Sequence, residues 1–360
     1  MASRTKVAVL KTTPEKVLED YGRLMRLADY GSFLPQDKPT SLKINISWQK
    51  FYPACSTTPW QLDGVIKTLL DDGYSRDSLW AAHNRTVVVD DKVGEINNKH
   101  KPVVEKYGVE NVHLYEEEWV DCPVKEGLRV LGSIFPDGLK IPKRLIGSNI
   151  IQLPTMKTHV FTTITGAMKN AFGGLINERR HWTHSVIHET LVDLLAIQKA
   201  IHPGMFAVMD ATFAGDGPGP RCMVPHVKDY LLAGGDYVAV DAIAAKMMGF
   251  DPLSLDFIRI AHEAGLGVGD PAEIEVVGDD IARVNFRFNG NRNTFASRGQ
   301  KLIYHGPLRP LERILLRTWL VPWSYLASNL YHNVFWYPLI GKPRVRRMLD
   351  TPWGNLFQSY

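Results

Sequence analysis

The chain has 360 residues, of which 45% are hydrophobic and 22% are charged, as is ordinary for a globular protein. Its 42 Lys and Arg residues slightly exceed its 38 Asp and Glu residues, which suits an anionic ligand or a membrane surface. The dense basic stripes typical of nucleic-acid-binding proteins are absent, so no nucleic-acid partner is expected. The three cysteines, Cys55, Cys122 and Cys222, are far apart, which excludes a cysteine-ligated iron–sulfur cluster or zinc site within this chain.

The widely spaced thiols favour a reducing compartment. The sequence shows neither the pattern of a signal peptide nor an uninterrupted apolar run of about 18 residues. We therefore expect a cytoplasmic protein, and any cofactor stays unknown at this point.

Short apolar runs alternate with longer amphipathic runs along most of the chain. Runs typical of strands occupy residues 7–10, 42–46, 86–89, 112–115, 129–131, 149–153, 206–210 and 274–277. Patterns typical of helices occupy residues 15–28, 57–73, 95–107, 190–201, 237–248 and 255–264, with Thr57 or Thr58 and Asp236 as candidate N-caps. This alternation predicts an α/β fold with a mostly parallel sheet and helices on both faces, over residues 1–285.

Residues 286–360 differ in composition and are expected to form a C-terminal appendage. Seven aromatic residues lie between Trp319 and Tyr337, and four cations follow between Lys342 and Arg347. Two interpretations of residues 305–360 stay open. Such a segment can bind the inner surface of a membrane peripherally. It can equally cap the α/β core or form a homo-oligomer contact.

Residues 154–188 concentrate cations and imidazoles around a Thr- and Gly-containing turn. Three predicted strand ends, at residues 43–45, 154–159 and 210–219, would face one crevice if their strands are neighbours, because ligands bind at the carboxyl ends of parallel strands. We expect Lys157, Lys169, His159 and His184 to be the catalytic residues of this crevice. The substrate-binding residues expected beside them are Lys43, Asn45, Thr158, Thr165, Asn170, Arg180, Asp210, Gly217 and Gly219.

A metal site is the alternative prediction for the same stretch. On a helix, His181, His184 and His188 would share one face, and Asp210 could add an oxygen ligand. Clustered cations disfavour the charged imidazolium form of these histidines. The neutral rings are instead suited to act as acid–base groups. Asp241 lies within an apolar helix and is interpreted either as part of a structural salt bridge with residues 157–180 or as a site residue.

Several fragments resemble the family known as domain of unknown function 362. They are Lys43-Ile44-Asn45, Thr57-Thr58-Pro59, LPTMKTH at 153–159, TGAMKNAFG at 165–173, His184, Asp210 before GDGPGP, GGDYVAVDAIAAKMMG at 234–249 and HEAGLGVGD at 262–270. The resemblance spans about residues 5–280, although the family's first motif usually reads Lys-Pro-Asn. It implies a domain and candidate site residues, without a reaction. Many relatives carry a ferredoxin-like cysteine module that this chain lacks, so a redox role would need an external electron donor.

Together these patterns predict an enzyme that acts on a carboxylate- or phosphate-bearing small molecule by proton transfer and electrostatic stabilisation, as an isomerase, lyase or reductase. One alternative is a metal-dependent or redox enzyme with His and Asp ligands. The other is a non-catalytic, membrane-associated ligand-binding protein.

Overall fold

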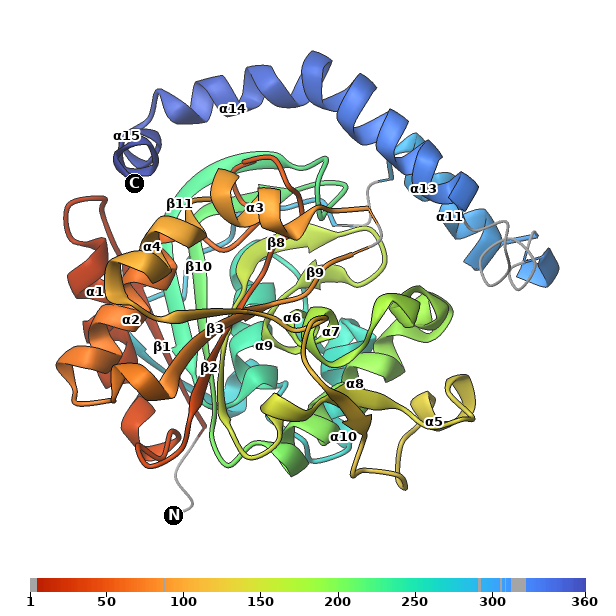
Figure 1. Cartoon of the computed structure of the whole chain (residues 1–360). Coiled ribbons are helices and arrows are strands. Elements are labelled where there is room, and N and C mark those ends of the chain that lie inside the picture. The colour runs from red at the N-terminus through yellow and green to blue at the C-terminus, as the bar shows by residue number, and fades with distance from the viewer. Residues whose placement is uncertain (1–4, 87, 291–292, 305, 308, 312–321) are drawn as a thin grey trace.

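A computed structural model describes residues 5–86, 88–290, 293–304, 306–307, 309–311 and 322–360. Within these residues a ten-stranded, mostly parallel sheet runs through the molecule in the order β12-β1-β11-β10-β7-β2-β3-β4, and β8 and β9 extend it beside β10 (Figure 1). Its strands are β1 (Thr5–Lys11), β2 (Thr40–Ile44), β3 (Leu79–His83), β4 (Glu110–His113), β7 (Asn149–Leu153), β8 (Thr155–His159), β9 (Thr163–Thr165), β10 (Met205–Asp216), β11 (Val224–Gly234) and β12 (Ile274–Gly278). A small antiparallel pair, β5 (Trp119–Asp121) and β6 (Lys140–Pro142), lies apart from it.

Helices cover both faces of the sheet, as predicted. Alternate residues of a strand point to opposite faces. In β1, Val7 and Val9 accordingly pack into one core cluster, and Ala8 and Leu10 pack into the other. The first face carries α5 (Leu131–Ile134), α6 (Ala167–Asn170), α7 (Phe172–Leu175), α8 (Ile187–Ile201), α9 (Tyr237–Met248) and α10 (Asp256–Glu263). The second carries α1 (Val17–Leu27), α2 (Pro59–Asp71) and α4 (His100–Tyr107), and α3 (Asp91–Asn97) precedes α4.

Local capping chemistry explains several helix boundaries. Thr58 and Gln61 form a reciprocal capping box at the start of α2, with Pro59 in the first turn. Asp236 accepts hydrogen bonds from the backbone N–H groups of Val238 and Ala239 and so begins α9. Both features confirm the predicted helix starts.

Four sequence-based element predictions were wrong. The strand expected at residues 86–89 lies at Leu79–His83 instead, as β3. The strand expected at residues 129–131 is instead the bend that leads into α5, because the Asp193 carboxylate accepts three backbone hydrogen bonds from residues 129–131. The single helix expected at 95–107 is two helices, broken where Lys99 adopts a left-handed conformation. The strand expected to end at Asp210 continues to Asp216, because it pairs with β11 in a long antiparallel hairpin.

The C-terminal segment packs along the α/β core (Figure 1). Its helices are α13 (Pro322–Asn329), a π-helix (Leu330–Gly341), α14 (Lys342–Leu349) and α15 (Pro352–Ser359), after α11 (Phe295–Tyr304). Trp336 packs 6.0 Å from Trp48, ring centre to ring centre, and Trp353 Nε1 donates a 2.7 Å hydrogen bond to Asp229. Trp319 of the predicted aromatic series lies outside the described residues, as do the side chains of Trp323 and Tyr325. Among the helices of the described segments, none has both the length and the apolar character that a membrane crossing requires.

Candidate functional site

A cavity of about 920 Å³ lies where the carboxyl ends of β2 and β8 meet the turn after β10. The basic side chains that line it are Lys43, Lys157, Lys169, Arg180, Arg221 and Arg298, and the imidazoles are His83, His159, His181, His184 and His332. None of the described residues that line the cavity is Asp or Glu. Such a wall carries a positive potential and suits an anionic ligand.

Three lysines reach the cavity from different elements. Lys43 comes from β2, Lys157 from β8 and Lys169 from α6. Lys157 Nζ donates hydrogen bonds to the Cys55 carbonyl and, at 3.1 Å, to Ser47 Oγ. Within the described residues none of the three lysines forms an ion pair with a carboxylate. Because a buried charge needs a partner, a bound anion would supply the neutralising charge.

Burial makes these lysines unusually weak bases. It lowers the pKa of Lys43 to about 7, and the nearby Arg180 guanidinium lowers it further. The pKa of Lys169 falls to about 7 through burial and through the charges of Lys157 and Arg180. Burial also lowers the pKa of Lys157, to about 8. Near neutral pH Lys43 and Lys169 can therefore exchange a proton with a ligand, whereas Arg180 stays charged.

Two histidines of the cavity offer opposite hydrogen-bonding capacities. Burial and the Lys169 charge hold the pKa of His159 well below its usual range, and burial lowers the pKa of His184 to about 3, so both rings are neutral. The backbone N–H of Phe161 points at His159 Nδ1 at 3.2 Å, which assigns the ring proton to Nε2. His184 Nδ1 lies 3.1 Å from the His181 carbonyl and must donate to it, which leaves Nε2 as an acceptor. One ring can thus donate to a ligand and the other can accept from it.

Most residues predicted from the sequence line this one cavity: Lys43, Asn45, Lys157, His159, Thr165, Lys169, Asn170, Arg180, His181, His184 and Gly219. Thr158, Gly217, His188 and Asp210 do not line it. Thr158 Oγ instead donates a 2.7 Å hydrogen bond to the Gly217 carbonyl and so fixes the turn after β10. The His188 ring packs 6.1 Å from the Phe257 ring.

Asp210 is a buried structural carboxylate rather than part of the cavity wall. Its Oδ2 accepts hydrogen bonds from Tyr21 at 2.6 Å and from Thr58 and Trp60 at 2.9 Å. Thr212 donates to the other oxygen from its hydroxyl and its backbone. This network joins β10 to α1 and α2 on the face opposite α9.

The histidine stretch does not form the single helix that the alternative metal prediction assumed. A 3₁₀-helix spans Glu178–Val186, and α8 begins at Ile187. His184 and His188 therefore fall on two different helices. Within the described residues, His181, His184, His188 and Asp210 contribute to no group of three or more metal-ligating atoms.

Asp241 positions the short helix that carries Lys169. Its two carboxylate oxygens accept hydrogen bonds from the backbone N–H groups of Ala167 at 2.6 Å and Met168 at 3.0 Å. Burial raises the pKa of Asp241 to about 7. The salt bridge to Lys or Arg offered as one interpretation of this residue is not seen among the described residues, and the hydrogen-bond partners of Asp241 there are backbone N–H groups.

Gly166→Ala is expected to destabilise the protein by about 2–4 kcal/mol, because a methyl group at residue 166 would overlap the Asp241 carboxylate and displace α6. Urea unfolding measures this loss. Gly132→Ala is the matched control, since a methyl group there meets no atom within 4 Å. Equal stability of the two variants would contradict the role of Asp241.

Four of the basic and imidazole side chains of the cavity wall escaped sequence reasoning: His83, Arg221, Arg298 and His332. His83 ends β3, a strand that the sequence placed a few residues too late, at 86–89. Arg221 follows the Gly- and Pro-rich turn, where no periodic pattern marks it. His83 could have been found from the sequence only through its strand, because it ends β3 just as His113 ends the neighbouring strand β4.

The fold and the cavity define an α/β protein with a cationic cavity at the carboxyl edge of its sheet. The family profile described as "Domain of unknown function (DUF362)" matches residues 41–246, more than half of the chain, and the chain belongs to this family. It is also 27% identical over 136 residues to a thylakoid-associated protein of Synechocystis sp.. That match covers 36% of this chain and 41% of the length of the cyanobacterial protein.

Proposed function

We propose that the chain is an enzyme that acts on a small molecule bearing a carboxylate or phosphate group. The observation that carries this proposal is the cavity wall, which brings together buried lysines, Arg180 and two neutral histidines, with no carboxylate among the described lining residues. Fixed cations in a buried site stabilise negative charge more strongly than they do in water.

The cavity residues divide into two roles. Lys157 and Arg180 are the more persistent charges near neutral pH and hold the anionic group. Lys43 and Lys169, with pKa values near 7, move protons. His159 donates through Nε2 to a developing oxyanion, and His184 accepts through Nε2. This set of groups favours proton-transfer chemistry, as in an isomerase or lyase. A reductase would require electrons from an external donor.

Identification of a co-purified ligand by native mass spectrometry is the direct test of the substrate class. A ligand that carries no anionic group would overturn the proposal. A ligand with a carboxylate or phosphate would support it and supply the compound for binding and turnover assays.

Lys157→Met is expected to weaken binding of that ligand by about 1.5–3 kcal/mol, the usual contribution of a hydrogen bond to a charged group. Isothermal titration calorimetry gives the difference in binding free energy. Lys140→Met is the matched control, because Lys140 is exposed and lies outside the cavity. If both variants bind the ligand as the wild type does, Lys157 does not hold the anion.

A second proposal concerns a membrane surface as partner. Along residues 326–340 the exposed apolar side chains are Leu326, Leu330, Val334, Phe335, Leu339 and Ile340. They recur every four or five residues, which suits one face of a helix that widens into a π-helix. The exposed cations Lys342, Arg346 and Arg347 follow. An apolar helix face beside cations is typical of helices that lie on anionic lipid. The name of the thylakoid-associated relative agrees with this proposal.

A further inference from the structure

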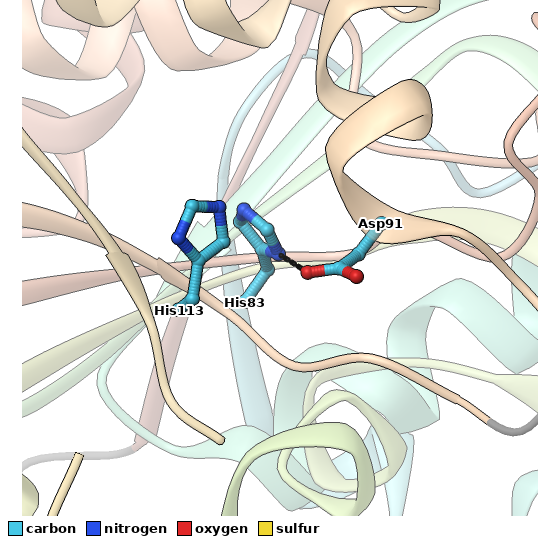
Figure 2. A group of neighbouring side chains, drawn as sticks. All are labelled: His83, Asp91 and His113. Atoms are coloured by element: carbon cyan, nitrogen blue, oxygen red, sulfur yellow. Dashed lines mark ion pairs between the residues drawn. The ribbon is translucent and has the colours of Figure 1, made fainter. Parts of the chain in front are cut away.

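A second cluster of polar side chains lies at the ends of β3 and β4 (Figure 2). It adjoins the cationic cavity, because His83 lines both. His83 and His113 are paired residues at the ends of these parallel strands, and their ring centres are 4.8 Å apart. Asp91 reaches them from the first residue of α3. One ligand atom of each of the three side chains lies within 4.8 Å of the others.

Among the described residues, two atoms of this cluster are buried and have no hydrogen-bond partner. They are His83 Nδ1 and Asp91 Oδ2, which face each other at 3.4 Å. The His83 side chain is only 1% exposed, and that of Asp91 is 7% exposed. If His83 is neutral, these two atoms have no partner among the described residues, which is costly and rare in folded proteins, and a bound group is then expected between them.

A neighbouring carboxylate decides the protonation of the His83 ring. Glu95, one helical turn after Asp91 on α3, accepts a hydrogen bond from His83 Nε2 at 2.9 Å. A neutral ring that donates from Nε2 has a bare lone pair on Nδ1. Two lone pairs, one on Nδ1 and one on Oδ2, then point at the same space. A cation between them removes the repulsion.

The spacing fits a metal ion. Nitrogen and oxygen ligands about 2.1 Å from a tetrahedral zinc ion are about 3.4 Å apart, the separation of His83 Nδ1 and Asp91 Oδ2. His113 Nε2 lies 3.2 Å from Glu95 Oε2 and its Nδ1 lies 3.5 Å from Glu116 Oε2, so His113 binds the ion by exchanging one of these contacts for the metal. The hydrogen bond from His83 to Glu95 matches the carboxylate that commonly orients a metal-bound histidine.

We infer that His83, Asp91 and His113 bind a divalent first-row transition-metal ion, with Glu95 orienting His83. Imidazole and carboxylate ligands without thiolate suit zinc, iron(II), cobalt(II) and manganese(II). His83 also lines the cationic cavity, so the ion lies at the cavity wall. The inference does not depend on the proposed function, because it rests on the ligand atoms alone.

The competing account is a metal-free ion pair, in which a doubly protonated His83 bridges Asp91 and Glu95. That account supplies a charge for both carboxylates, and although burial opposes it, the contacts with Asp91 and Glu95 raise the pKa of His83. Against it, the contact from Nδ1 to Asp91 lacks hydrogen-bond geometry. The two accounts differ in one measurable property, which is stoichiometric metal uptake by the full-length protein.

The experiment uses full-length protein treated with a chelator and then titrated with Zn²⁺ or Co²⁺. Uptake of one equivalent, with visible cobalt d–d absorption free of thiolate charge transfer, is expected. His113→Gln and Asp91→Asn should each weaken uptake at least 100-fold, and Glu95→Gln should weaken it about 10–100-fold. His202→Gln is the matched control, because His202 is a buried histidine outside the cluster.

Thermal unfolding with and without Zn²⁺ separates a lost site from a lost fold. Folded His113→Gln protein should show no rise in Tm with Zn²⁺, whereas the wild type and His202→Gln should show a rise. Wild-type protein that takes up no equivalent of Zn²⁺ or Co²⁺, or wild-type affinity in folded His113→Gln, would overturn the inference.

Discussion

Lys43→Met is expected to increase the free energy of unfolding at pH 6 by about 1–3 kcal/mol. The Lys43 side chain is buried and has no carboxylate partner in the part of the chain that the structure describes, and burial lowers its pKa to about 7. Full charging at this position has an upper-limit cost on the order of 5 kcal/mol, because each pKa unit corresponds to about 1.36 kcal/mol. Structural relaxation reduces that figure. Met keeps the length of the side chain and removes the charge.

The pH dependence of this gain follows from proton binding. An unfolded lysine titrates near pH 10.4, whereas Lys43 in the folded protein titrates near pH 7. Between these values the unfolded state binds more protons, so the stability of the wild type rises with pH. The advantage of Lys43→Met is therefore full below pH 7 and shrinks toward pH 10.

Urea unfolding of the wild type and of Lys43→Met between pH 6 and pH 10 measures this difference. Lys140→Met is the control at an exposed lysine and should change stability little at any pH. A less stable Lys43→Met at pH 6, or an advantage that does not depend on pH, would contradict the view that Lys43 is a buried charge awaiting an anion.

Local sequence patterns predicted the parts of the site that lie close together in the chain. Lys157, His159, Lys169 and Arg180 belong to one segment, and the apolar run before it identified the strand that brings them to the sheet edge. Asp210 was predicted at the same edge because the strand expected at residues 206–210 ends at this residue. The pairing of β10 with β11 continues the strand, so Asp210 falls in its middle and contacts α1 and α2.

Other features depend on contacts between distant segments, which no local pattern encodes. His83, Asp91 and His113 come from two strands and a helix, and each alone is an ordinary polar residue in the sequence. The C-terminal segment, residues 286–360, shows the same limit of local sequence patterns. Its composition suggested either packing or membrane binding, and the structure separates the residues: Trp336 and Trp353 pack inward, while Val334 and Phe335 are exposed.

Replacing Leu330, Val334 and Phe335 together with Gln is expected to reduce binding to anionic vesicles at least 100-fold. These side chains are 52%, 65% and 56% exposed, so they are available to lipid without unfolding of the protein. Burial of their exposed portions in a bilayer contributes about 1 kcal/mol each, estimated from apolar area. Co-sedimentation with vesicles of mixed neutral and anionic lipid measures the partition.

Point substitutions test this proposal more cleanly than removal of the tail. Truncation before the tail would also remove Trp353, which packs in the core, and would destabilise the whole fold. Ile146→Gln is the matched control, because Ile146 is 40% exposed and lies elsewhere on the surface. Arg346→Gln and Arg347→Gln should each reduce binding by about 1 kcal/mol on anionic vesicles and leave neutral vesicles unaffected. If the wild type stays in the supernatant while the triple variant loses a dimer in analytical ultracentrifugation, this helix face binds protein rather than lipid.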